Sequence, residues 1–155
     1  GEAWEWDGVR FELLAPDAGA ARGRSGNDSS CVLRVSAGPH AMLLAGDIER
    51  AGEASLEAHA QGRLRVAVLL VPHHGSRTSS SPAFIAATAP DWAVFSVGYR
   101  NRFRHPSGEV IARYLAAGAR IARTDRDGAV SVRLGPAGVE VEVERTRRAR
   151  YWRGI

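Results

Sequence analysis

Six consecutive apolar residues, Val66 to Val71, run directly into a proline and two histidines, and this stretch limits the fold more than any other. The run is rich in β-branched residues and too short for an independent helix, which is typical of a strand buried on both faces. Pro72 has no backbone N–H to donate and therefore ends the strand. His73, His74 and Gly75 follow at once. The stretch predicts a central strand whose carboxyl end carries a polar functional site.

Short apolar segments alternate with helical segments along the rest of the chain. The turns at Asp7-Gly8 and Gly135-Pro-Ala-Gly138 indicate two hairpins. Ser81-Pro82 and Ser107 are typical of helix starts. This order predicts an α/β fold with a mixed sheet and flanking helices. The expected strands cover residues 4–14 (a hairpin), 31–36, 41–45, 66–71, 92–97, 119–123 and 130–143 (a hairpin), and the expected helices cover 48–60 and the segments after Ser81 and Ser107.

Side-chain burial is also expected at particular positions. Glu49, Glu53 and Glu57 recur every four residues and are expected on one solvated helix face. Cys31 is expected to be a small core residue, and as the single cysteine it excludes an internal disulfide. In the helix after Ser107, the residues expected in the core are Val110, Ile111, Tyr114 and Leu115.

Length and charge divide the chain into a domain and a tail. The 155 residues fit one domain with its own core, predicted to span residues 1–144. All 21 basic residues are arginine, and five of them lie in the acid-free residues 145–155, a basic aromatic tail. This tail is either solvated or binds nucleic acid or an anionic membrane surface. No run approaches the roughly 18 apolar residues of a membrane span, and no signal peptide is recognisable. The chain opens at Gly1 as though cut from a longer protein.

Three polar clusters follow the carboxyl ends of expected strands: Asp47, the His73-His74 pair, and the segment 101–105 that ends in His105. In open α/β sheets ligands bind at that edge, so we expect the clusters to meet there. One carboxylate with two or three imidazoles suits zinc or Mn²⁺. Each cluster also has a structural interpretation, with Asp47 as a helix cap, the histidine pair as a hydrogen-bonded turn, and His105 as a structural residue.

Two further loops favour contacts with phosphate. The loop from Gly75 to Ser81 combines hydroxyls, a guanidinium and amide N–H groups before a helix start, which suits a phosphate. The alternative is a polar loop with a helix cap. Residues 99–104 interleave three arginines with Tyr99 and Phe103, a pattern that can grip phosphates and stack on bases. The alternative here is a solvated loop.

Four blocks in a fixed order carry a resemblance to a known family. They are Gly46-Asp-Ile-Glu, Leu-Leu-Val-Pro-His-His-Gly-Ser-Arg-Thr-Ser, Asn101 through His105-Pro106, and Arg123-Thr-Asp-Arg-Asp-Gly-Ala. Together they resemble the C-terminal metallo-β-lactamase-like domain of ComEC, the DNA-internalisation protein of natural competence. The resemblance implies an αββα sandwich and metal-dependent hydrolysis of phosphodiesters in one strand of incoming DNA. It also implies a soluble domain of a bacterial inner-membrane protein, on the extracytoplasmic side and beside the parent protein's transmembrane channel.

The resemblance assigns roles by position. Asp47 matches the carboxylate that bridges two metal ions, Zn²⁺ or Mn²⁺, and His74 matches a late metal ligand. His73 ligates as well or contacts the substrate phosphate, and His105 binds the phosphate or donates a proton. Asn27 stands where many relatives have a ligand histidine. Asp47, His73 and His105 are thus the expected catalytic residues, and the expected substrate contacts are Ser76, Arg77, Thr78, Ser79, Asn101, Arg102 and His105.

One motif of the resembled family is absent. No His-x-His-x-Asp-His string occurs in the chain, so it is expected to be the C-terminal part of the sandwich. We expect this chain alone to hold metal weakly or not at all and to be inactive. We also expect self-association or rearranged packing through an uncovered sheet face. Two other functions remain open: a non-catalytic DNA-binding module, and a hydrolase of a small phosphodiester or phosphocholine ester.

Overall fold

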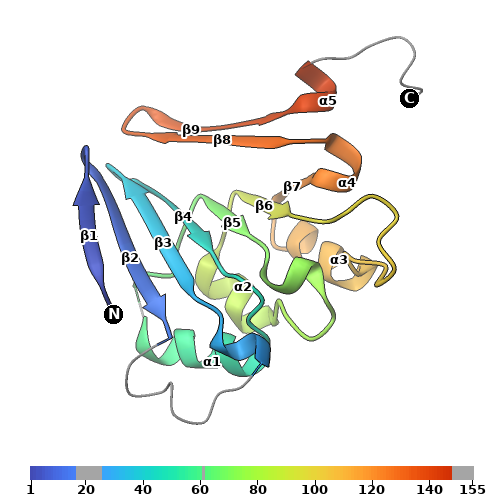
Figure 1. Cartoon of the computed structure of the whole chain (residues 1–155), viewed down its shortest axis with the longest axis horizontal. Coiled ribbons are helices and arrows are strands. Elements are labelled where there is room, and N and C mark those ends of the chain that lie inside the picture. Colours follow the sequence, from blue (N-terminus) through green and yellow to red (C-terminus); the bar gives the residue numbers. More distant parts are fainter. Residues whose placement is uncertain (17–25, 61, 148–155) are drawn as a thin grey trace.

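A computed structural model describes residues 1–16, 26–60 and 62–147 (Figure 1). The described elements confirm the expected alternation of strands and helices. In chain order they are β1 (Ala3–Trp6), β2 (Val9–Ala15), the 3-10 turn η1 (Gly26–Ser29), β3 (Val32–Ala37), β4 (His40–Leu44), α1 (Arg50–His59), β5 (Val68–Leu70), the 3-10 turn η2 (Pro72–Gly75), α2 (Pro82–Thr88), β6 (Trp92–Phe95), α3 (Gly108–Ala116), β7 (Arg120–Arg123), α4 (Thr124–Asp127), β8 (Val130–Gly135), β9 (Gly138–Val143) and α5 (Glu144–Arg147).

Seven strands form one mixed sheet in which spatial order follows chain order from β1 to β7. The pairs from β1 to β4 are antiparallel, and the pairs from β4 to β7 are parallel. The run that begins at Val66 supplies β5, which is paired on both sides: Val68 lies opposite Met42 of β4 and Trp92 of β6. The sequence prediction of a central strand and an α/β mixed sheet is therefore confirmed. Because β4 to β7 are parallel, their carboxyl ends share one edge.

Helices α1, α2 and α3 connect the parallel strands and cover one face of the sheet (Figure 1). Crossovers between parallel strands take one hand, so successive connections in one direction place their helices on the same face. This face holds a continuous core in which Leu43, Leu69 and Phe95 of the sheet pack against Phe84 of α2 and Tyr114 of α3. All five side chains are fully buried. This core fixes the strands whose ends carry the candidate site.

The opposite face is only partly covered. The hairpin of β8 and β9 forms a separate two-stranded sheet over this face (Figure 1). Its valines, including Val132 and Val141, pack with Val68 and Val94 in a second apolar cluster. At the β1 edge Trp4 and Trp6 remain 47% and 70% exposed. The expectation of self-association through an uncovered face stays a prediction.

Three burial expectations are wrong. Glu53 is 0% exposed, because its carboxylate accepts backbone hydrogen bonds from Ser80 and Ser81. Leu115 is 57% exposed: it follows Tyr114, and one helical step of about 100° turns it away from the core. Cys31 is exposed: it lies just before β3 begins, and its neighbour Val32 is the residue that is buried in the core.

Two further observations concern the chain as a whole. Within the described ranges, no helix combines the length and the apolar character needed to cross a membrane. Of the expected tail, the described part lies in α5 (Glu144–Arg147), and residues 148–155 lie outside the described residues.

Candidate functional site

The three polar clusters meet at the shared carboxyl edge of the sheet, as predicted. Asp47 follows β4, the histidine pair lies in η2 after β5, and His105 lies in the loop after β6. The backbone N–H of His73 donates to the carbonyl oxygen of Gly46 at 3.0 Å, which ties the first two clusters together. His73 and His74 both have left-handed backbone angles, with φ of 46° and 54°. Such conformations are strained in non-glycine residues and cluster at functional sites.

His74 presents its outer nitrogen to a carboxylate. Its Nδ1 lies 2.7 Å from the carbonyl oxygen of Ser96, and because a carbonyl only accepts, Nδ1 carries the hydrogen. The Nε2 atom then faces Asp47 Oδ1 at 3.5 Å. Both side chains are about half exposed. The two facing atoms, a ring nitrogen and a carboxylate oxygen, attract each other only when a proton or a metal ion lies between them.

Asp47 does not act as a helix cap. The N-cap of α1 is Glu49, and Asp28 caps the helix instead: its Oδ1 accepts from the backbone N–H groups of Glu49 at 2.7 Å and Gly52 at 2.9 Å. These bonds explain why η1 packs against the start of α1. The carboxylate of Asp47 is left on the rim, where its described side-chain partner is His74.

Glu49 is a site residue that sequence reasoning missed. Its Oε1 lies 3.0 Å from His73 Nδ1 and accepts hydrogen bonds from Thr78 Oγ1 at 2.9 Å and Asn27 Nδ2 at 3.1 Å. The available signal was its position two residues after Asp47. Asn27 Nδ2 also lies 3.5 Å from His73 Nε2. The amide at 27 therefore contacts the site through its nitrogen, on the side of His73 and Glu49.

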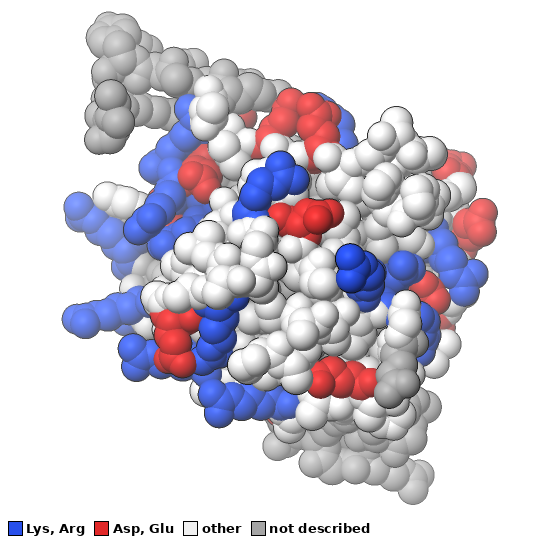
Figure 2. Space-filling view, turned by 180° about the vertical axis from the view of Figure 1, so that it is seen from behind, with Lys and Arg blue, Asp and Glu red and all other residues white. Residues whose placement is uncertain are grey.

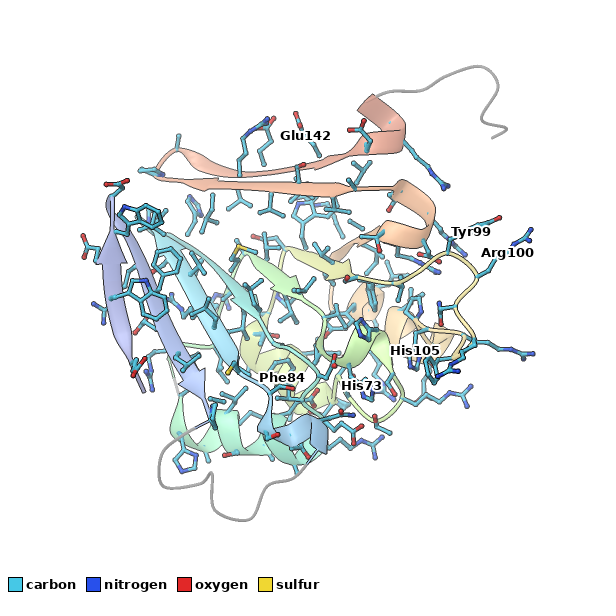
Figure 3. The ribbon with its side chains drawn as sticks, in the orientation of Figure 1. His73, Phe84, Tyr99, Arg100, His105 and Glu142 are labelled. Atoms are coloured by element: carbon cyan, nitrogen blue, oxygen red, sulfur yellow. The ribbon has the colours of Figure 1, made fainter. Side chains whose placement is uncertain are left out.

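His105 joins the cluster from the loop after β6. Its ring lies edge-on to that of His73, with centroids 5.9 Å apart, and stacks on Phe103 at 5.8 Å. Figure 3 shows His73 and His105 side by side on neighbouring loops. Burial lowers the pKa of His105 below its ordinary value, and nearby His73 and His74 lower it further. The neutral imidazole is therefore favoured at this position.

The donor atoms at the rim suit a metal ion in type but not in number. Asp47 with His74, and Glu49 with His73, form two separate carboxylate–imidazole pairs. Among the residues that the structure describes, no group of three or more histidine, cysteine or acidic side chains is placed to hold a metal ion. A catalytic zinc takes three protein ligands as a rule. These residues therefore fit part of a metal site.

The expected phosphate contacts in the loop from Gly75 to Ser81 divide into two groups. Ser76 and Ser79 are buried, and the Ser79 hydroxyl donates to the carbonyl oxygens of Pro72 and Ser76, so these serines hold the loop together. Thr78 and Arg77 face outward on the rim of a pocket beside His73. The lining of that pocket is Asp28, Glu49, Arg50, Ala51, Arg77 and Thr78.

Comparison with known proteins identifies several relatives that match nearly the whole chain. No family model matches the chain. The chain is 43% identical over 97% of its length to "Competence protein ComA" of Neisseria gonorrhoeae. It is 32% identical over 95% of its length to "Recombination protein 2" of Haemophilus influenzae, and 32% identical over 86% to "ComE operon protein 3" of Bacillus subtilis. The chain covers 21%, 18% and 17% of these three proteins. Almost the whole chain is therefore homologous to a segment that makes up about one fifth of each of these relatives.

Proposed function

We propose that this chain is the part of a competence DNA-uptake protein that hydrolyses phosphodiester bonds in one strand of incoming DNA. The observation that carries the proposal is the convergence of Asp47, His73, His74 and His105 at the ends of three adjacent strands. The name of one relative, "Competence protein ComA" of Neisseria gonorrhoeae, supports the competence role. The helix-covered sheet with a partly open second face is consistent with one half of a metallo-β-lactamase-type sandwich.

Asp47 and His74 are the residues that would hold metal, with His73 as a further donor. Their oxygen and nitrogen atoms are ligands that Zn²⁺ and Mn²⁺ accept, and the remaining ligands would have to come from residues beyond those described. A pair of such ions supplies a Lewis acid and neutralises charge on the phosphoryl oxygens. The hydrogen bond from His74 Nδ1 to Ser96 fixes the ring so that Nε2 faces the site.

The other residues at the rim would bind and orient the substrate. A neutral His105 can donate one N–H to a phosphate oxygen, and Arg77 and Thr78 offer a guanidinium and a hydroxyl at the same edge. Glu49 holds His73 through Nδ1, and Nε2 lies on the side of Asn27. In this proposal DNA is the partner, and this chain lies on the extracytoplasmic side of the membrane, next to the transmembrane part of the same protein.

The test is metal-dependent cleavage of labelled single-stranded DNA by this chain and by the full-length protein that contains it. Asp47→Asn and His74→Gln should each lower the cleavage rate of the full-length protein by at least about 100-fold, because each removes a donor at the rim. His59→Ala is the matched control, since His59 is an exposed histidine whose Nδ1 lies 2.8 Å from the carbonyl oxygen of Ser55 in its own helix. Unchanged cleavage in both rim variants would contradict the nuclease assignment.

A non-catalytic DNA-binding module is the second candidate. It is favoured by the lack of a three-ligand group among the described residues. In that case the full-length protein would bind DNA with Zn²⁺, Mn²⁺ or Mg²⁺ present and cleave none. Cleavage that disappears with chelator and returns with one of these metals would rule this candidate out.

A further inference from the structure

The loop between β6 and α3, residues 98–106, displays two aromatic rings to solvent. We call it the arginine loop. Tyr99 is 69% exposed and Phe103 is 64% exposed. Figure 3 shows Tyr99 and Arg100 projecting away from the body of the protein. Large exposed aromatic side chains cost free energy in water, so a pair of them on one loop calls for a ligand.

The display of these rings is built into the loop. The side chain of Asn101 donates from Nδ2 to the carbonyl oxygens of His105 at 2.7 Å and Gly98 at 3.2 Å. Its Oδ1 accepts from the backbone N–H of His105 at 2.9 Å. Arg100 and Arg104 have left-handed backbone angles, with φ of 53° and 55°. One amide thus closes the loop across its base and holds the aromatic residues at its outer side.

Charge in the arginine loop is unbalanced. The guanidinium of Arg100 lies 5.2 Å above the Tyr99 ring, and that of Arg102 lies 4.8 Å above the Phe103 ring. Arg100, Arg102 and Arg104 form no ion pair with a carboxylate of the described residues. Figure 2, which views the molecule from behind, shows basic side chains gathered along its left edge. This edge corresponds to the right-hand side of Figure 1, where the arginine loop lies. An anionic ligand is therefore favoured at this edge.

A ring contact connects the arginine loop with the candidate site. Phe103 lies nearly parallel to His105, with centroids 5.8 Å apart and planes 16° apart. His105 in turn meets the edge of His73. The arginine loop is therefore in contact with the histidine cluster through the rings of Phe103 and His105.

We propose that Tyr99 and Phe103 are a stacking platform for unpaired bases of a single-stranded nucleic acid, with Arg100 and Arg102 on the flanking phosphates. The proposal rests on the proposed function and names the form of its substrate. Every base has a π-face, and stacking on an aromatic side chain needs no particular sequence. Bases paired in a duplex have both faces covered, so the platform selects single strands. An anionic membrane is disfavoured, because Asn101 and the stack on His105 hold the rings at the site rather than free to insert.

The test is binding of a fluorescent oligothymidylate to the full chain in chelator, where no metal-dependent cleavage occurs. Tyr99→Ala and Phe103→Ala should each weaken binding about 10-fold. Phe103→Trp should bind as tightly as the unchanged chain. Phe103→Leu should bind as weakly as Phe103→Ala, because leucine keeps apolar area without a π-face. Arg102→Ala should lower the slope of log affinity against log salt by about 1. The matched control is Trp6→Ala, which removes an aromatic residue that is 70% exposed at the far β1 edge, and it should leave binding unchanged.

Each contrary result has a definite meaning. Unchanged affinity in both alanine variants, an equal loss for duplex DNA, or an equal loss in Trp6→Ala would overturn the platform. A different outcome is that the loop variants bind vesicles of anionic phospholipid more weakly while their binding of oligothymidylate is unchanged. That result would assign the loop to a membrane. Because the readout is binding without metal, it is independent of the cleavage test: a protein that stacks single strands but cleaves nothing would refute only the proposed hydrolysis.

Discussion

Two neighbouring loops carry the histidines of the candidate site, and they are held in opposite ways. The loop after β5, residues 71–81, which we call the histidine–serine loop, is fixed from beneath by buried polar groups. The arginine loop after β6 is fixed by one of its own side chains, Asn101, and exposes its aromatic rings. The difference teaches that His73 and His74 lie on a support of buried polar groups. The aromatic rings proposed for base stacking lie on the loop that is held by its own side chain and exposes them to solvent.

The support beneath the histidine–serine loop is a buried polar cluster. Glu53 accepts from the backbone N–H groups of Ser80 and Ser81, and Tyr114 donates its hydroxyl to Ser80 Oγ at 3.1 Å. Arg113 donates to the Ser80 carbonyl oxygen at 2.9 Å. Burial raises the pKa of Tyr114, so this hydroxyl stays protonated and remains a donor. Helices α1 and α3 are thereby joined through the loop.

The largest effect is expected from the buried support. Glu53→Ala leaves two backbone N–H groups without their acceptor in the interior, and it should lower the free energy of unfolding by about 4 kcal/mol. Glu57→Ala, one turn later on α1, is the control and should change it by about 0.5 kcal/mol or less. Urea denaturation followed by circular dichroism measures both. Equal effects of the two substitutions would show that the cluster does not support the loop.

The next effect tests the contact between the two loops at Gly75. Its carbonyl oxygen accepts from the Ser107 N–H at 2.9 Å, and an added Cβ would lie 2.7 Å from Phe95 and 2.8 Å from Pro106. Gly75→Ala should therefore destabilise the protein by about 3 kcal/mol, combining a left-handed alanine with a clash. Gly62 has the same φ of +79° and open space around it, so Gly62→Ala isolates the conformational part, about 1 kcal/mol. An equal fall of the melting temperature in both variants, measured by thermal unfolding, would contradict the close contact.

A smaller effect is expected in the arginine loop. Asn101→Ala removes three hydrogen bonds at an only partly buried position and should cost about 1 kcal/mol of global stability. Its local effect should be greater, with faster exchange of the His105 amide hydrogen in deuterium exchange. Asn101→Asp keeps the acceptor for that amide and should preserve its protection. Unchanged exchange in Asn101→Ala would mean that other groups hold the loop.

The smallest effect is a pH dependence carried by His105. Burial and the adjacent His73 and His74 lower its pKa in the folded chain from the ordinary value of 6.5. Between that value and the lower folded pKa the unfolded chain binds more protons, so stability is greatest above pH 6.5 and falls as the pH drops through the folded pKa. His105→Asn should reduce the loss of stability between pH 8 and pH 5, measured by urea denaturation in chelator. A steeper loss in the variant would reverse the sign of the pKa shift.

The sequence predicted those features that depend on local pattern. The apolar run ending at Pro72 predicted the central strand, and the Asp7-Gly8 and Gly135–Gly138 turns predicted both hairpins. The meeting of Asp47 with the histidines was predictable too, because parallel strands share their carboxyl edge. It was not predictable that Glu49 contacts His73, since helical spacing shows which residues share a face but not what that face contacts.

Glu53 illustrates the difference between what the sequence alone determines and what only the tertiary structure decides. By itself the sequence determined the strands, the helix starts and the edge at which the polar clusters meet, because hydrophobic period and turn chemistry are properties of neighbouring residues. Only the tertiary structure decided that Glu53 is buried, that Leu115 is exposed, and that Phe103 stacks on His105. Glu53 is buried because backbone donors 27 and 28 residues later satisfy its carboxylate. Such pairings exist only after the chain has brought distant segments together.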